Sequence, residues 1–97
     1  MKNHTKIFVN LPVKNLKKSM DFFAKLGFAF NPQFTDQNAA CMIVGEDIFI
    51  MLLVKDFFKT FTKKTIVDAT KSSEAIIALS ADSKEKVDEI VNKALAA

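Results

Sequence analysis

KIFVNLPVKNLKKSMDFFAKLGFAFNPQF, residues 6–34, is the stretch that decides the fold of this chain. Residues 7–13 alternate apolar side chains with others, which is the period-2 pattern of a strand. Asn15 is a favoured helix N-cap type, and apolar residues then recur at helical spacing until Gly27, which suits a helix end. Residues 28–34 predict a second strand. The stretch therefore indicates strand, helix, strand.

Two short apolar runs follow, and they predict a β-hairpin. Residues 39–44 and 48–54 are separated by Gly45-Glu46-Asp47, a turn sequence. Pro32 places the preceding strand at a sheet edge or a bulge. If the first two strands are neighbours, a right-handed crossover makes them parallel. The first 54 residues thus read as a strand-helix-three-strand module.

The strand-then-helix order returns near the C-terminus as EAIIALSA followed by DSKEKVDEIVNKALAA. With Asn15 and Asp82 as the two N-caps, the copies are offset by 82 − 15 = 67 residues, and this offset carries Met20 onto Val87 and Phe23 onto Ile90. The apolar stripes of the two helices coincide. The sequence therefore predicts an α+β fold in which a second module stops after its strand and helix, as a truncated copy would.

These boundaries define one domain over residues 1–97. It comprises a first module over residues 6–54, a connection over 55–73 and a partial second module over 74–97. The connection begins with Phe57, Phe58 and Phe61 on one face of a short helical turn, with lysines around them. That cluster is better explained by packing than by stacking on single-stranded nucleic acid, because the chain has no arginine.

Composition is that of a soluble domain with an adequate core. Of the 97 residues, 49% are hydrophobic and 26% are charged, and lysine supplies all 14 positive charges of a net +3. The lack of arginine argues against nucleic-acid recognition, and no apolar run is long enough to cross a membrane. A lone cysteine, Cys41, forms no internal disulfide and suits a reducing compartment. We therefore predict a cytoplasmic protein with no nucleic-acid or membrane partner.

The motif V-K-N-L-K-K-S-M-D-F-F, residues 13–23, resembles the opening of the vicinal oxygen chelate superfamily. That superfamily includes glyoxalase I, extradiol dioxygenases and the fosfomycin- and bleomycin-resistance proteins. The resemblance implies paired strand-helix-three-strand modules whose sheets curl around a small-molecule site. It covers residues 6–54 as a complete module and residues 74–97 as a partial one.

The resemblance also implies where a metal ion would be held, because metal-using members place His, Gln or Glu early in the first strand and in the last strand of each module. These positions fall on Phe8, on Met51 and, by the repeat, on Ala75. Phenyl, thioether and methyl groups are not ligands for a hard or borderline divalent cation. We therefore expect no metal and no other cofactor.

The same positions predict an apolar cavity. Phe8 and Asn10 share one face of the first strand, and Phe49 and Met51 belong to the last strand of the module. They can line a site for an apolar or aromatic small molecule, or they can simply fill the space between two sheets. The amide of Asn10 can orient a ligand or can bond a neighbouring backbone group. For the cavity and for Asn10 alike, the sequence leaves a ligand-binding role and a structural role open.

No catalytic residue emerges from the sequence. His4, the only histidine, lies in a polar N-terminal segment, and Cys41 lies within an apolar strand without an activating base nearby. A core thiol is the simpler interpretation of Cys41.

These observations favour a glyoxalase/bleomycin-resistance/dioxygenase-like protein that binds a small molecule without metal. They leave open whether it is an enzyme. One alternative is a lactoylglutathione-lyase- or dioxygenase-type enzyme with ligands from other positions. The other is a truncated, catalytically inert protein that forms a homodimer, in which each chain completes the sheet of its partner.

Overall fold

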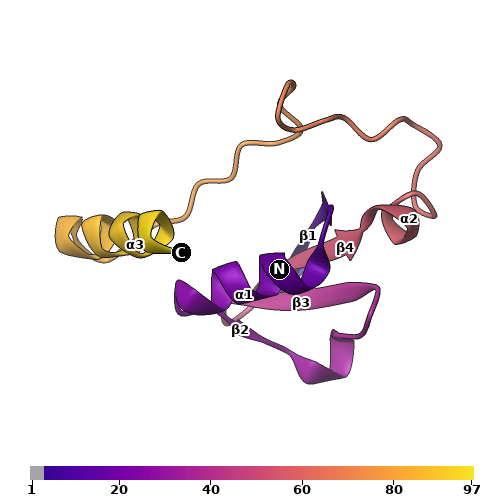
Figure 1. Cartoon of the computed structure of the whole chain (residues 1–97). Helices are drawn as coiled ribbons and strands as arrows, with labels where there is room; N and C mark the ends of the chain where they lie inside the picture. The colour runs from indigo at the N-terminus through magenta and orange to yellow at the C-terminus, as the bar shows by residue number, and fades with distance from the viewer. Residues whose placement is uncertain (1–3) are drawn as a thin grey trace.

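A computed structural model describes residues 4–97, which form a four-stranded sheet with a helix on one face (Figure 1). The first module consists of β1 (Ile7–Val13), α1 (Leu16–Lys25), β2 (Ala29–Phe30), a 3-10 turn η1 (Pro32–Phe34), β3 (Ala39–Gly45) and β4 (Ile48–Val54). Then come α2 (Lys55–Phe58) and α3 (Lys84–Ala96). The α+β class and the strand-helix-three-strand module are thus confirmed.

The strand order is β1-β4-β3-β2, which places the first strand beside the last. β1 and β4 are parallel, with Ile7 opposite Ile48 and Val13 opposite Val54. β3 is antiparallel to both β4 and β2. β1 and β2 are therefore not neighbours, and the one parallel pair among the described strands joins β1 to β4.

Helix α1 forms where its capping residues predict. The Asn15 Oδ1 atom accepts a hydrogen bond from the Lys18 N–H at 3.0 Å, and Gly27 has φ +100°, a conformation that side chains with a Cβ rarely adopt. Leu16 is buried at the start of the helix. The helix packs on a core formed by Leu16, Ala40, Met42, Ile50 and Leu52, with half-buried residues such as Val9, Met20 and Phe23 around it.

β2 is shorter than the sequence pattern predicts. Of residues 28–34, only Ala29 and Phe30 pair with β3, and the chain then enters the 3-10 turn. The Asn31 Oδ1 atom caps that turn by accepting from the Gln33 N–H at 2.9 Å, and Pro32 follows as its first residue. The cap and the proline together end the strand, because proline has no N–H to donate to a ladder.

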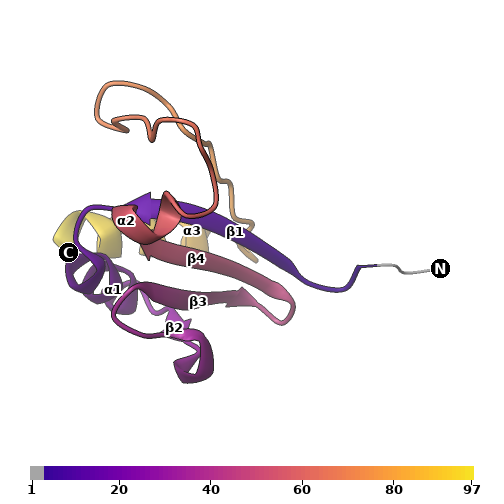
Figure 2. The same ribbon diagram turned by 90° about the vertical axis from the view of Figure 1, so that its right-hand side faces the viewer.

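The strand expected over residues 74–80 does not form and pairs with no strand among residues 4–97. Residues 75–81 have no regular secondary structure, and Ile76 is 93% exposed. Figure 2 shows the long connection after α2 rising away from the sheet before it reaches α3. β-branched composition favours a strand, but a strand also requires a neighbour to satisfy its backbone groups.

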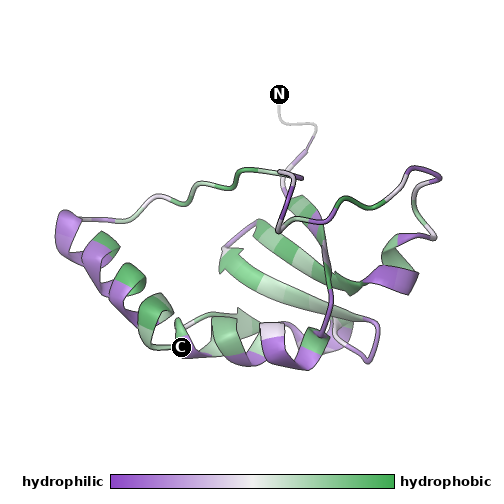
Figure 3. Cartoon of the chain, turned by 45° about the horizontal axis from the view of Figure 1, so that its top comes forward, coloured by the Kyte–Doolittle hydropathy of each residue, from purple (hydrophilic) through white to green (hydrophobic). Residues whose placement is uncertain are grey.

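The C-terminal helix is confirmed, but its cap is Ser83 and not Asp82. The Ser83 Oγ atom accepts from the Lys86 N–H at 3.2 Å, so the cap lies one residue beyond the position that the repeat offset predicts. Val87, Ile90 and Val91 remain 41–50% exposed on an apolar stripe that Figure 3 shows as green patches along α3. Within residues 4–97, no helix has both the length and the apolar composition that crossing a bilayer requires.

Candidate functional site

The four residues predicted to line a cavity lie together on the sheet face opposite α1, which we call the open face. Strand pairing puts Phe8 beside Phe49 and Asn10 beside Met51. Side chains alternate between the two faces of a sheet, and the neighbouring residues Val9, Ile50 and Leu52 belong to the helix-covered core. The parallel pairing of β1 with β4 is therefore what brings this set together.

An aromatic pair dominates the open face. The rings of Phe8 and Phe49 are stacked, with centroids 4.9 Å apart and planes inclined by 14°. The Lys6 Nζ atom lies 5.6 Å from the centroid of the Phe49 ring and 3.2 Å from the Asp47 Oδ1 atom. Phe8 remains 47% exposed, so much of the stack can still contact another molecule.

A hollow of about 180 Å³ lies over this pair, lined by Lys6, Phe8, Asn31, Phe34, Cys41 and Phe49. Asn31 and Phe34 reach it because the turn between β2 and β3 is fixed to β3. The Thr35 Oγ1–H donates to the Asn31 carbonyl at 2.7 Å, and Thr35 Oγ1 accepts from the Cys41 N–H at 3.1 Å.

Sequence reasoning missed four of these six lining residues: Lys6, Asn31, Phe34 and Cys41, the last of which was predicted only as a core thiol. Asn10 and Met51, which were predicted to line the cavity, do not line this hollow. The sequence Asn31-Pro32 was the available signal for a turn there, because both residues favour chain reversal. Phe34 comes next to Phe8 only because β1 pairs with β4, and no local sequence pattern shows that non-local pairing.

A second hollow, of about 330 Å³, adjoins Asn10 and is lined by Asn10, Phe58, Phe61 and Thr62. The phenylalanine cluster after β4 therefore lies over the open face. Phe57 and Phe61 meet edge to face at 5.2 Å, and Phe58 is half-buried. Asn10 is exposed, and its side-chain amide forms no hydrogen bond with any other residue in the range 4–97. The amide is therefore free to bond a ligand.

The metal positions implied by the resemblance do not fit a cation. Phe8 offers no donor atom, Met51 offers only a thioether, and Ala75 lies in the unpaired connection. Within residues 4–97, no three His, Cys, Asp or Glu side chains are grouped closely enough to hold a metal ion.

The two reactive side chains singled out from the sequence do not join the site as catalysts. Cys41 is fully buried in β3, and burial raises the pKa of its thiol, which disfavours the nucleophilic thiolate. His4 is exposed ahead of β1.

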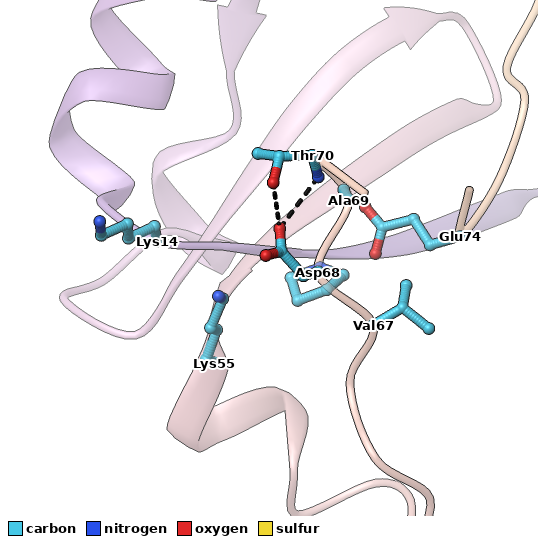
Figure 4. A pocket seen from close by; sticks show the side chains of 8 residues that line it. Lys14, Lys55, Val67, Asp68, Ala69, Thr70 and Glu74 are labelled. Carbon is cyan, nitrogen blue, oxygen red and sulfur yellow. Dashed lines mark hydrogen bonds between the residues drawn. The ribbon is translucent and has the colours of Figure 1, made fainter. Parts of the chain in front are cut away.

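A polar hollow of about 480 Å³ lies at the C-terminal end of β1, between Lys14, Lys55 and the connection (Figure 4). The Asp68 Oδ1 atom there accepts from the Thr70 hydroxyl at 2.6 Å and from the Thr70 N–H at 3.0 Å. These hydrogen bonds, and more weakly the charge of Lys55, lower the pKa of Asp68. Glu74 also lines this hollow. The hollow therefore carries both positive and negative side chains and favours no single class of ligand.

Comparison with known proteins supports the relationship that the sequence motif suggested. Residues 5–45 match the family model described as bleomycin resistance protein-like N-terminal. A solved structure, that of the hypothetical protein SA1046 from S. aureus, superposes with a TM-score of 0.77 at 28% sequence identity. The alignment covers 98% of this chain and 71% of that one. Among curated proteins, none matches this chain.

Proposed function

We propose that the chain binds a small aromatic molecule without a metal ion, as a protein on the glyoxalase/bleomycin-resistance side of the vicinal oxygen chelate superfamily. The family-model match over residues 5–45 and the similarity to the solved structure support this assignment. The observation that carries the proposal is the stacked pair of Phe8 and Phe49 on the open face. Of this pair, Phe8 occupies a position at which metal-using relatives would need a nitrogen or oxygen donor.

The open face favours a planar ligand. Phe8 and Phe49 offer a half-exposed aromatic surface, and aromatic rings prefer offset stacking or edge-to-face contact with further rings. The hollow above them, about 180 Å³, suits a small ring system rather than a drug-sized molecule. Asn10, exposed nearby, supplies a donor and an acceptor to orient a polar substituent.

The site fits non-covalent binding better than catalysis. Cys41 is buried, which raises the pKa of its thiol, and the metal positions lack nitrogen and oxygen donors. Neither a nucleophile nor a Lewis acid is therefore available at the stacked pair. Binding by aromatic contact needs only the surface that the strands already present.

The proposal is tested by titrating the protein with a naphthalene-based fluorescent probe. Removing either stacked ring by Phe8→Ala or Phe49→Ala should weaken binding at least about fivefold, since an aromatic contact contributes roughly 1 kcal/mol. Phe22→Ala is the matched control, because Phe22 lies on α1, across the sheet from the hollow. Equal loss of binding in all three variants would indicate nonspecific attachment and would refute the site.

The enzyme alternative makes a different prediction. Turnover of a hemithioacetal or a catechol that a chelator abolishes, together with stoichiometric metal in the purified protein, would replace the binding role with metal-dependent catalysis. Metal content that persists in Phe8→Ala and Met51→Ala variants would show in addition that the ligands lie elsewhere.

A further inference from the structure

The polar side chains that line the hollow over the stacked pair present hydrogen-bond donors. Besides three phenyl rings and the buried Cys41, the lining consists of Lys6 and Asn31. An ammonium group carries three donors and no acceptor, and an asparagine amide carries two donors and one acceptor. What the hollow offers a ligand therefore depends on which of these groups are already hydrogen-bonded within the chain.

Asn31 is held so that only its amide NH2 group is left for a ligand. Its backbone N–H donates to the Cys41 carbonyl at 2.9 Å, and its carbonyl accepts from the Thr35 hydroxyl at 2.7 Å. Its Oδ1 atom accepts from the Gln33 N–H at 2.9 Å. Among residues 4–97, no group accepts a hydrogen bond from its Nδ2 atom. Asn31 therefore contributes donors to the hollow, from a side chain whose position is fixed.

Lys6 is anchored at its backbone, and its charge is available to a ligand. The N–H of the next residue, Ile7, donates to the Asp47 carbonyl at 2.9 Å, and the Lys6 Nζ atom lies 3.2 Å from Asp47 Oδ1. The two side chains are 53% and 51% exposed, and an ion pair at that exposure contributes little to stability. The ammonium can therefore bind a second anion, either beside Asp47 or in exchange for it.

The same geometry determines the sign of the charge that the hollow accepts. Lys6 is the only charged residue of the six that line it. Its Nζ atom lies 5.6 Å from the centroid of the Phe49 ring, where it already occupies the position in which an aromatic face attracts a cation. A cationic ligand would be repelled by Lys6. A carboxylate would instead accept a charge-assisted hydrogen bond from Lys6 and a further one from Asn31.

We propose that the ligand of this hollow is an aromatic carboxylate, whose ring contacts Phe8 and Phe49 and whose anionic group is bound by Lys6 Nζ and Asn31 Nδ2. This inference rests on the aromatic site of the proposed function and adds the charge of its ligand. The two donors are what distinguishes one ring compound from another there, because the remaining lining is apolar.

Three naphthalene probes of similar shape test the charge preference: naphthoate, neutral naphthamide and naphthylmethylammonium. Their fluorescence can be followed directly, because the chain contains no tryptophan and no tyrosine. At neutral pH the unmodified chain should bind naphthoate about fivefold more tightly than naphthamide, as an exposed ion pair allows. Naphthylmethylammonium should bind more weakly than naphthamide. High salt should narrow these differences, since it screens exposed charges.

Two variants at Lys6 and its ion-pair partner should change the preference in opposite directions. Lys6→Met keeps an unbranched apolar stem and removes the charge, so it should abolish the preference for naphthoate and leave naphthamide affinity unchanged. Asp47→Asn removes the competing carboxylate and should tighten naphthoate binding by about twofold. Lys18→Met is the matched control, because Lys18 is an exposed lysine on α1, across the sheet from the hollow, and it should keep the full preference.

A variant at Asn31 tests the second donor on a different element. Asn31→Asp retains an oxygen that can cap the turn and replaces the NH2 group by a carboxylate oxygen. It should weaken naphthoate binding by about fivefold or more while naphthamide binding persists. Lys6 and Asn31 lie at separate points of the chain, so a folding defect in one variant leaves the other as the test.

Equal affinity for naphthoate and naphthamide in the unmodified chain overturns the inference. So does a folded Lys6→Met variant that keeps the preference, or one that loses affinity for both probes alike. If naphthamide binding is nevertheless lost in Phe8→Ala, the aromatic site stands and only its charge preference is refuted. Failure of all three probes to bind the unmodified chain refutes the aromatic site and the charge preference together.

Discussion

Phe8 and Phe49 are expected to stabilise the sheet jointly, and a double-mutant cycle measures that coupling. Burying a whole phenylalanine side chain is worth about 1.5–3 kcal/mol, and Phe8 is 47% exposed, so its burial alone contributes about 1 kcal/mol. Stacking at 4.9 Å adds about 0.5–1.5 kcal/mol. Phe8→Ala should therefore lower the free energy of unfolding by about 2 kcal/mol.

The assay is urea unfolding of four proteins: the unmodified chain, Phe8→Ala, Phe49→Ala and the double variant. Protein concentration is held constant, because association shifts apparent stability. The losses of unfolding free energy in the two single variants should sum to about 1 kcal/mol more than the loss in the double variant. The reason is that each single variant already removes the stack, so the sum counts its loss twice.

Additivity within about 0.3 kcal/mol would refute this reasoning, because independent sites add to that precision. The rings would then be neighbours without mutual stabilisation. The proposal that they present one continuous aromatic surface to a ligand would lose its structural basis. Phe22→Ala combined with Phe8→Ala is the matched control, and its effects should be additive because Phe22 lies on α1 and the sheet separates it from Phe8.

Three further predictions concern the cap, the helix end and the acid range. Asn15→Ala should cost about 1 kcal/mol of stability in urea unfolding through loss of the hydrogen bond to Lys18, whereas Asn15→Asp should cost little. Gly27→Ala should destabilise by about 1 kcal/mol because the φ of this residue is +100°, although no atom beyond its two chain neighbours lies within 4 Å of the added Cβ. An unchanged midpoint would show that the backbone relaxes. Thr70→Val should raise the pKa of Asp68 towards its ordinary value in an NMR titration, since Thr70 lowers it. The stability that these hydrogen bonds give is present above the ordinary aspartate pKa, about 3.9, and is lost as pH falls through the lowered pKa of the folded state. The free energies of unfolding of the variant and the unmodified chain should therefore differ at neutral pH and become equal in acid.

Elements specified by neighbouring residues were predictable from the sequence. Asn15 and Gly27 delimit α1 because a cap and a left-handed glycine act within a few residues of the backbone they satisfy. The hairpin of β3 and β4 forms because a turn sequence separates two apolar runs; in the structure Gly45 ends β3, and Glu46 and Asp47 make the turn. Alternation along β1 also placed Phe8 and Asn10 on one face correctly.

Features that depend on distant partners were not predictable in the same way. Two local features were missed as well, because several neighbouring residues could fill the same role: Asn31 caps a turn that ends β2 early, and Ser83 caps α3 in place of the adjacent Asp82. Residues 74–80 have strand-like composition, yet pairing is a property of two segments and not of one. Phe34 reaches the hollow only through the turn that Thr35 fixes.

The placement of β1 beside β4 constrains how a newly made chain can fold. β1 cannot form its hydrogen bonds with β4 until Ile48, 41 residues after Ile7, has been synthesised. While the ribosome adds those residues, at roughly 5–20 per second, α1 has no completed sheet to cover and its apolar side faces the solvent. The hairpin of β3 and β4 is local and can close early, whereas β1 can join the sheet only after β4 has been made.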